Sequence, residues 1–451
     1  MDIRKFTTKF SEIDETLNPQ QREVVELVVH KLQNVFMTGP GGVGKSHTIR
    51  SLLETAKQER FVCCVTALTG TAAYELNCGA STLHRWAGIG TGRGNVNSLI
   101  NRISKKNKKA FNRWVTTDIL VIDEISMMDA DLFEKLDVIG RQLRRKDLPF
   151  GGIVILASGD FYQLPPVVEL GITRFAFESS YWFKVFKHNI ELTYNYRQSG
   201  DNRYLKMLNQ IRVGRIRKGT IKSLQKRIID STTELDSRDI KPTRLLPVKR
   251  KVNMINDNYF SLLKDVAVEY DMTETIPKPI ECGGFDQRSI NDEYKTVKKA
   301  NSSRIPAKFI SKVGAQVMCT VNYDPERGIV NGSRGVVVGN SEIGPRVQFH
   351  NGETVVFKPY TIKSEVIPEI SISGIPLIYA WAITIHKCQG STLDLCIVDL
   401  GRDVFEAGQA YVALSRVRSL DGLYITNFDT GAFRLKGRVT RFYNRIRNKS
   451  T

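Results

Sequence analysis

A glycine-rich loop near the start of the chain carries residue types that bind phosphate. The segment Gly39-Pro-Gly-Gly-Val-Gly-Lys-Ser46 fits the pattern G-x-x-x-x-G-K-[ST]. Glycines let backbone N–H groups converge on phosphate oxygens, and a helix N-terminus favours negative charge. Lys45 can reach the β and γ phosphates, and Ser46 can ligate magnesium. We predict that ATP is bound here by Gly39, Gly41, Gly42, Val43, Gly44, Lys45, Ser46 and His47.

A pair of acids follows a later apolar run. Asp123 and Glu124 come directly after Ile119 to Ile122. A carboxylate at the end of a strand can hold Mg²⁺ through Asp123, while Glu124 can act as general base on the attacking water. Two such acids often form only a loop or a helix cap, but the phosphate-binding loop upstream favours the catalytic interpretation.

Three further side chains are candidates for contacts with the γ phosphate. Gln163, in Gly159-Asp-Phe-Tyr-Gln163, is a neutral amide that can sense the γ phosphate or order the water. Arg197 and Arg416 are candidates for the cation that stabilises charge on the transferring phosphate. Either arginine can instead be an ordinary surface residue.

Gln21 has two competing interpretations. It lies in Leu17-Asn-Pro-Gln-Gln21, before a helical pattern of apolar residues. Asn18 is a good N-cap, Pro19 suits the first helical position, and Gln21 can close a capping box. The alternative is that its amide recognises adenine.

The elements that must position these residues indicate an α/β fold. Short apolar runs, each followed by a loop of small or acidic residues, are typical of buried parallel strands. They lie at Val35 to Thr38, Phe61 to Thr66, Ile119 to Ile122 and Ile153 to Ala157. Leu132, Leu136, Ile139 and Leu143 predict a helix between two of them. Ligands of such sheets bind at the carboxyl ends of the strands, where the candidate residues fall.

A later region has a different pattern. From about 306 to 373, short alternating runs separated by Gly and Asn predict a small antiparallel β-barrel inserted into the α/β framework. Residues 377 to 384 then resume the pattern of a buried strand.

The net charge of +19 favours a polyanionic partner. Two acid-free segments, 76–117 and 431–451, hold +15 of it, so the rest of the chain is nearly balanced. Solvated surface and a frayed tail are the competing explanation.

The cysteine pattern and the apolar runs point to an intracellular, soluble protein. The seven cysteines include no C-x-x-C pair, which fits a reducing compartment. We find no signal peptide pattern, and the apolar runs are too short to cross a bilayer. Nucleus, cytoplasm, organelle and viral replication site are not distinguished.

The motifs, in this order, resemble the superfamily-one DNA helicases of the RecD-like branch, and closely the Pif-one (petite integration frequency) family. Beyond the ATPase motifs, the resemblance depends on Val65-Thr-Ala-Leu-Thr-Gly-Thr-Ala-Ala73, Thr82-Leu-His-Arg-Trp-Ala-Gly-Ile-Gly90, Gly159-Asp-Phe-Tyr-Gln-Leu-Pro-Pro-Val167 and Thr384-Ile-His-Lys-Cys-Gln-Gly-Ser391. It extends from about Leu17 to Phe428.

The resemblance implies two RecA-like P-loop motor domains with a small wedge insertion and an inserted SH3-like β-barrel domain. The expected bounds are 1–190 for motor domain 1A, with the wedge at about 88–113; 191–305 and 374–430 for motor domain 2A; about 306–373 for the barrel; and 431–451 for a basic C-terminal tail. Arg197 and Arg416 would close the second domain on the nucleotide.

The resemblance also implies contacts with single-stranded DNA. They would come from Thr66, Thr71, His84, Trp86, Thr384, His386 and Lys387. A buried aromatic pair is the competing interpretation of His84 and Trp86. The basic segment that includes Lys105 and Lys106 falls where the family inserts its wedge, and it can track phosphates or press against the fork.

We therefore expect an ATP-dependent DNA helicase that moves 5′ to 3′ and unwinds forked or 5′-tailed duplex, with G-quadruplexes or RNA–DNA hybrids as further candidate substrates. The resemblance alone implies the polarity and the pathways, which are replication, repair or recombination. It also implies the oligomeric state, a monomer with a DNA-induced dimer as the alternative. Two alternatives stay open: an RNA helicase, and an ATP-gated single-strand clamp that does not unwind.

Overall fold

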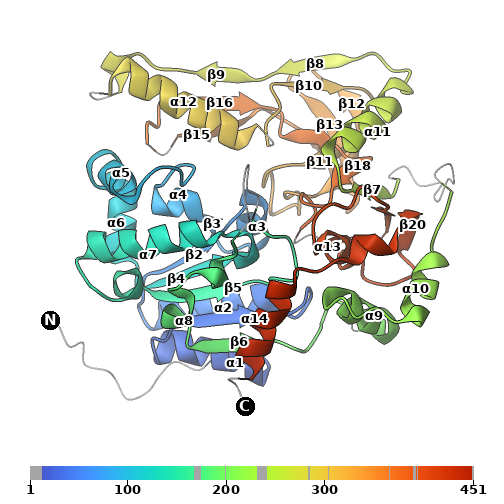
Figure 1. Cartoon of the computed structure of the whole chain (residues 1–451). Coiled ribbons are helices and arrows are strands. Elements are labelled where there is room, and N and C mark those ends of the chain that lie inside the picture. The colour runs from blue at the N-terminus through green and yellow to red at the C-terminus, as the bar shows by residue number, and fades with distance from the viewer. Residues whose placement is uncertain are drawn as a thin grey trace. The chain divides into compact units, whose positions relative to one another are not determined.

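The computed structural model describes residues 13–166, 174–198, 200–230, 241–282, 285–302, 304–364, 366–389, 393 and 395–448, except the side chains of Thr71, Tyr74 and Ala300. The chain packs into two compact units (Figure 1). Unit 1 contains residues 1–223, 405–420 and 430–451, and unit 2 contains residues 224–404 and 421–429. The predicted boundaries of the motor domains stay a prediction.

Unit 1 is built on a parallel sheet. Its strands are β1 (Val35–Thr38), β2 (Cys63–Ala67), β3 (Ser81–Thr82), β4 (Ile119–Asp123), β5 (Val154–Ser158) and β6 (His188–Glu191), in the order β3-β2-β4-β5-β1-β6. All the neighbouring strands pair in parallel. The predicted strands are thus confirmed to within two residues at each end. Alternate residues face two separate apolar cores, as Phe36 and Val35 do on β1.

The helices of unit 1 cover both faces of this sheet. They are α1 (Pro19–Val25), α2 (Lys45–Gln58), α3 (Gly70–Glu75), α4 (Leu83–Ala87), α5 (Val96–Asn101), α6 (Lys108–Thr116), α7 (Ala130–Arg144), α8 (Trp182–Val185), α9 (Asn202–Arg212), α13 (Gln409–Leu414) and α14 (Gly437–Arg447). The short π-helical segments are η1 (Glu26–His30) and η2 (Arg102–Lys106), and the short 3-10 helices are η3 (Ile125–Met127), η4 (Pro149–Gly152), η5 (Ala176–Glu178) and η7 (Thr430–Phe433). The helix α10 (Lys218–Gln225) crosses the boundary between the units.

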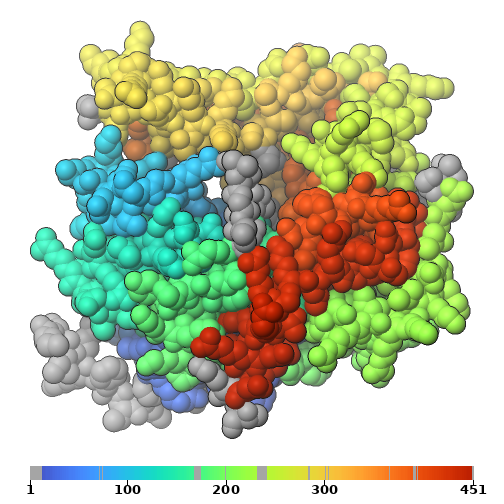
Figure 2. All heavy atoms as spheres, viewed as in Figure 1, coloured from blue at the N-terminus to red at the C-terminus, as the bar shows by residue number. Residues whose placement is uncertain are grey.

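The C-terminal segment is a packed helix, which corrects the expected basic tail. The side chains of Val439, Phe442, Tyr443 and Ile446 on α14 are buried in the core of unit 1. Their spacing places them on one helix face. Figure 1 shows α14 beside β6 and α8, and Figure 2 shows it forming part of the molecular surface of this unit.

Much of the positive charge of this segment is paired within the chain. Lys436 lies 3.0 Å from Glu406, Arg438 lies 3.1 Å from Glu178, and Arg447 lies 2.8 Å from Glu191. The side chain of Arg445 stacks on the ring of Phe183. Three of the seven basic residues of this segment are therefore paired with carboxylates of unit 1.

Unit 2 contains a second parallel sheet. Its strands are β7 (Thr243–Leu246), β18 (Ala382–Thr384), β19 (Cys396–Leu400) and β20 (Leu423–Phe428), in the order β18-β7-β19-β20. The helix α11 (Lys249–Ser261) contributes Val252 to a small apolar cluster with Leu246 and Ala382.

Antiparallel strands form the remainder of unit 2. The larger sheet has the order β14-β13-β12-β11-β17, with β11 (Gln316–Cys319), β12 (Arg334–Asn340), β13 (Pro345–Phe349), β14 (Thr354–Val356) and β17 (Leu377–Tyr379). Smaller sheets contain β8 (Val268–Asp271) with β10 (Lys308–Ser311), and β9 (Thr273–Thr275) with β16 (Ser371–Gly374) and β15 (Tyr360–Lys363). The 3-10 helix η6 (Pro279–Glu281) and the helix α12 (Gln287–Asn301) lie between β9 and β10 in the sequence.

The strand pairing differs from the sequence expectation in two details. The strands β8 and β9 precede residue 306 and pair with β10 and β16. Within residues 377–384, β17 joins the antiparallel sheet, whereas β18 joins the parallel sheet. The fold class, α/β with an added antiparallel region, is confirmed, and the SH3-like form of that region stays a prediction.

Candidate functional site

The phosphate-binding loop joins β1 to α2 in unit 1. Gly44 is the N-cap of α2 and has a φ of 85°, in the left-handed region that favours glycine. The ammonium of Lys45 donates to the carbonyls of Gly39 at 2.8 Å and Pro40 at 3.0 Å. Burial lowers the pKa of Lys45, and the charges of Asp160, Glu124 and Asp123 act in the opposite direction. The lysine thus lies at the loop, where phosphate oxygens would compete with these two carbonyls for its protons.

The predicted metal and water ligands lie at the end of β4. Asp123 is the last residue of this strand and is buried. Burial raises the pKa of Asp123, while the N–H of Glu124 and the charge of Lys45 lower it. Glu124 has φ 53° and ψ 42°. A non-glycine residue in this region costs about 1–3 kcal/mol, and such strain concentrates at functional sites.

The oxygen donors here fit a hard divalent cation. Mg²⁺ usually binds through one or two protein ligands together with water and substrate phosphates. The buried carboxylate of Asp123 and the hydroxyl of Ser46, on the first turn of α2, are ligands of this kind.

Both candidate arginines reach the phosphate-binding loop. A Cβ atom placed on Gly41 would lie 3.5 Å from a guanidinium nitrogen of Arg197 and 3.5 Å from one of Arg416. Ser415 accepts from both, through its carbonyl at 3.2 Å from Arg197 and through its Oγ at 2.7 Å from Arg416. Burial, and secondly the charge of Arg416, lower the pKa of Arg197 to about 10. Two cations therefore lie at one loop, and their contact with the γ phosphate stays a prediction.

The helix that precedes Arg416 is bonded to the same loop. The hydroxyl of Tyr411, on α13, accepts from the backbone N–H of Gly41 at 3.1 Å. Burial raises the pKa of Tyr411 to about 12. Gln163 is also buried near this region, in the turn after β5, where its N–H donates to the carbonyl of Asp160 at 2.8 Å.

Gln21 forms the capping box of α1. Its Oε1 accepts from the N–H of Asn18 at 3.0 Å, and its own N–H donates to the Asn18 side chain at 3.0 Å. Its Nε2 donates to the carbonyl of Val43 at 3.4 Å. The structural interpretation of Gln21 is confirmed, and the contact with adenine stays a prediction. The ring of His47 lies 3.0 Å from the hydroxyl of Thr16.

Residues at this site that sequence reasoning missed include Glu75, Asp160 and Arg212. Glu75 is the last residue of α3, and burial raises its pKa to about 8 against the opposing charges of Arg416 and Arg197. Asp160 and Arg212 form a buried ion pair. Asp160 and Arg212 are far apart in the sequence, so no local pattern could have predicted that they form a pair.

Two predicted DNA contacts lie in the interior of unit 1, which argues against their roles. The side chain of Trp86 is 2% exposed and packs on Trp114 with ring centroids 4.6 Å apart. Thr66 is buried on β2, and its hydroxyl donates to the carbonyl of Val121 at 2.7 Å. The burial of both side chains favours the packing interpretation, and contact of either residue with DNA stays a prediction.

The other two residues of unit 1 predicted to contact DNA from this region are His84 and Thr71. His84 is half-buried, and burial lowers its pKa. Thr71 lies in α3, and its side chain is outside the described part of the structure.

The basic segment after Gly90 forms a small helical insertion, α5, η2 and α6, packed against α4 and α7. Leu99, Ile103 and Trp114 anchor it in the core. Arg113 donates to the carbonyls of Trp86 and Arg85 and so caps the end of α4. Exposed lysines cover the outer side of the insertion, namely Lys105, Lys106, Lys108 and Lys109.

The remaining candidates lie in unit 2, after β18. Thr384 ends this strand, and its carbonyl accepts from the N–H of Lys387 at 3.0 Å in a tight turn. Thr384 and His386 are half-buried and Lys387 is exposed. The turn can present these side chains to a strand of nucleic acid, and that contact stays a prediction.

The fold and the site together define a class. A parallel α/β sheet has a phosphate-binding loop after its first strand and an acid pair at the end of β4, with two arginines at the loop. This is the arrangement of a P-loop nucleoside triphosphatase.

Comparison with known proteins places the chain within this class. The family model for the PIF1-like helicase matches residues 16–226, and the model for the 2B domain of DNA helicase Pif1 matches residues 303–339. The chain is 37% identical to ATP-dependent DNA helicase PIF1 of Danio rerio over 97% of this chain and 65% of that protein. It is 31% identical to ATP-dependent DNA helicase RRM3 of Saccharomyces cerevisiae over 95% of this chain and 68% of that protein.

Solved structures agree. The crystal structure of Pif1 helicase from Candida albicans matches with a TM-score of 0.81 and 36% identity, over 95% of this chain and 99% of that one. The chain therefore belongs to the PIF1-like helicase family. It spans about 65% of the length of the Danio rerio relative. In the described residues, no helix is long and apolar enough to cross a membrane.

Proposed function

We propose that this protein is an ATP-dependent DNA helicase. The observation that carries the proposal is the meeting of Lys45, Arg197 and Arg416 at one phosphate-binding loop. Phosphoryl transfer depends on positioning and on neutralising charge on the transferring phosphate. An ammonium and two guanidinium groups at the loop supply this, and the relatives are named ATP-dependent DNA helicases.

In the proposed reaction, the backbone N–H groups of Gly41 to Ser46 and the ammonium of Lys45 hold the phosphates of ATP. Glu124 accepts a proton from the attacking water, and Gln163 orients this water or senses the γ phosphate. Asp123 and Ser46 would hold Mg²⁺, which neutralises phosphate charge when bound. Arg197 and Arg416 stabilise the charge that develops during transfer.

We further propose that hydrolysis drives movement along single-stranded DNA in the 5′ to 3′ direction, with separation of forked or 5′-tailed duplex. The direction is taken from the family resemblance. The exposed lysines of the helical insertion and the turn after β18 are the proposed contacts with the DNA backbone. The protein is proposed to act as a monomer or as a DNA-induced pair, in a reducing intracellular compartment that suits its free thiols.

The test is ATP hydrolysis with and without single-stranded DNA, alongside strand displacement on DNA and RNA duplexes. Wild type should hydrolyse ATP faster with DNA, and Lys45→Ala should abolish hydrolysis. Stimulated hydrolysis without displacement would indicate an ATP-gated clamp. Displacement of RNA but not DNA would indicate an RNA helicase. No hydrolysis by the wild type would contradict the proposal.

A further inference from the structure

One hydroxyl group at the C-terminal end of the chain has three polar partners in the interior of unit 1. The hydroxyl oxygen of Tyr443 lies 2.8 Å from Oγ1 of Thr38, 3.1 Å from the N–H nitrogen of Phe161 and 3.1 Å from Oδ1 of Asp160. An ionised carboxylate only accepts and a backbone N–H only donates. The hydroxyl therefore donates to Asp160 and accepts from Phe161 and Thr38, an arrangement that satisfies its full bonding capacity.

The partners of this hydroxyl belong to two segments of the proposed ATP site. Thr38 is the last residue of β1 and directly precedes Gly39, the first glycine of the phosphate-binding loop. Asp160 and Phe161 begin the turn that carries Gln163, whose N–H donates to the Asp160 carbonyl at 2.8 Å. The hydroxyl of Tyr443 thus joins the base of the phosphate-binding loop to the turn of Gln163.

The surroundings hold this junction in one geometry. The ring of Tyr443 stacks on that of Tyr162, with centroids 4.5 Å apart and an angle of 11° between the planes. Arg212 donates to both oxygens of Asp160, at 2.8 and 2.9 Å, and its guanidinium lies 4.9 Å from the ring centroid of Tyr162. Both members of the ion pair are buried. A buried polar network that is fully bonded rigidifies and specifies one arrangement.

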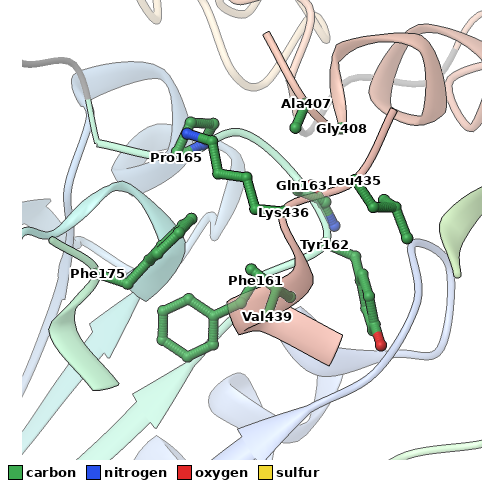
Figure 3. A pocket seen from close by; sticks show the side chains of 10 residues that line it. All are labelled: Phe161, Tyr162, Gln163, Pro165, Phe175, Ala407, Gly408, Leu435, Lys436 and Val439. Carbon is green, nitrogen blue, oxygen red and sulfur yellow. The ribbon is translucent and has the colours of Figure 1, made fainter. Parts of the chain in front are cut away.

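The start of the same helix contacts the same turn. Figure 3 shows a small pocket lined by Tyr162 and Gln163 together with Leu435, Lys436 and Val439 at the start of α14, and with Ala407 and Gly408 before α13. A Cβ atom on Gly408 would lie 2.6 Å from the carbonyl oxygen of Gln163, so only glycine permits this approach. The segment between Lys436 and Tyr443 therefore borders the Gln163 turn at two places.

We propose that Tyr443 is a positioning residue for ATP hydrolysis, whose hydroxyl sets the placement of the Gln163 turn relative to the phosphate-binding loop. This inference depends on the proposed ATPase function. It makes α14 a part of the ATPase machinery rather than a DNA-binding tail. Because Gln163 is proposed to act on the γ phosphate or the water, loss of the hydroxyl should affect the rate of hydrolysis more than the binding of ATP.

The test compares steady-state ATP hydrolysis by the full chain and matched variants. Tyr443→Phe removes the hydroxyl and keeps the stacked ring, and Thr38→Val removes one partner at nearly constant volume. Phe186→Leu is the control, because Phe186 is buried in the same apolar core but its ring packs on Trp182, with centroids 4.5 Å apart, and on Phe133 rather than on the Gln163 turn. Thermal unfolding of each variant shows that the assay temperature lies below its transition.

We expect Tyr443→Phe to lower kcat by about tenfold and to change KM for ATP by less than about twofold, since small misplacements at a reacting centre are costly. The double variant Thr38→Val/Tyr443→Phe should be no slower than the slower single variant, because both changes break one junction. Phe186→Leu should lower the unfolding midpoint and keep kcat.

Several results would overturn the inference. A kcat of folded Tyr443→Phe within about twofold of wild type would do so, as would the same loss of kcat in Phe186→Leu. If Tyr443→Phe does not fold, Thr38→Val alone must lower kcat, and an unchanged kcat there overturns the inference. Absence of hydrolysis by the wild type would instead contradict the proposed function itself, so the two failures are distinguishable.

Discussion

The guanidinium of Arg212 donates two hydrogen bonds to the carboxylate of Asp160, at 2.8 and 2.9 Å, and both side chains are buried. Removing one partner of a buried ion pair leaves an uncompensated charge, which costs about 3–5 kcal/mol. We therefore expect Arg212→Met to lower the free energy of unfolding of unit 1 by that amount in a denaturant titration. Arg215→Met, at an exposed position three residues on, is the control. A decrease in the free energy of unfolding of less than about 1 kcal/mol would contradict the expected contribution of this ion pair to stability.

Glu75 should make the stability of the protein depend on pH. Its folded pKa of about 8 exceeds the ordinary value of 4.5, chiefly because of burial. Between these values the folded state holds a proton that the unfolded state has lost, so this residue makes stability fall as the pH rises from 4.5 to 8. Glu75→Gln lacks this effect.

The measurement is the thermal unfolding midpoint of wild type and Glu75→Gln at pH 5 and pH 8.5. Relative to the wild type, the unfolding midpoint of Glu75→Gln should be higher at pH 8.5 than at pH 5. The same difference at both pH values would show that Glu75 titrates normally.

Much of the fold could be predicted because it depends on local patterns. The strand Val35–Thr38 and the helix over Leu132 to Leu143 follow from apolar runs and a spacing of three and four residues. The phosphate-binding loop and the acid pair are likewise contiguous in the sequence. Their positions at the ends of β1 and β4 agree with that reasoning.

The parts that could not be predicted depend on long-range packing or on a pattern given too little weight. Asp160 and Tyr443 are joined only by the tertiary fold, since 283 residues separate them. Nothing local distinguishes a buried Trp86 from one that stacks on a base. By contrast, the helical spacing of Val439, Phe442, Tyr443 and Ile446 could have been recognised in the sequence. The arginines around these residues favoured the interpretation as a basic tail instead.

The exposed lysines of the helical insertion should hold DNA through its phosphates. Changing Lys105, Lys106, Lys108 and Lys109 to Gln should weaken binding of single-stranded DNA and reduce the dependence of log K on log salt by up to about 0.7 for each phosphate that the protein no longer neutralises. Hydrolysis of ATP without DNA should not change. The measurement is fluorescence anisotropy at several salt concentrations.

A charge-matched control for that experiment carries four exposed lysines changed to Gln elsewhere, at Lys206, Lys218, Lys222 and Lys226. Its DNA affinity should stay near that of the wild type. Equal losses of affinity in both variants would show that net charge, rather than the insertion, determines binding.

Trp86 should matter for stability and not for DNA binding. Because its ring is buried against Trp114, Trp86→Ala should lower the free energy of unfolding by about 3–5 kcal/mol. The folded variant should bind single-stranded DNA within about twofold of the wild type. Unfolding in denaturant and anisotropy at a permissive temperature measure the two quantities. A large decrease in affinity with unchanged stability would restore the role of Trp86 in binding DNA.

The most direct test of the central proposal is strand displacement on otherwise identical DNA duplexes with a 5′ tail or a 3′ tail, with ATP and Mg²⁺ present and with Lys45→Ala as the inactive control. We predict displacement from the 5′-tailed duplex by the wild type and none by Lys45→Ala. Displacement from the 3′-tailed duplex alone would contradict the proposed direction of movement. Displacement from neither duplex, with ATP hydrolysis intact, would contradict the proposed helicase activity.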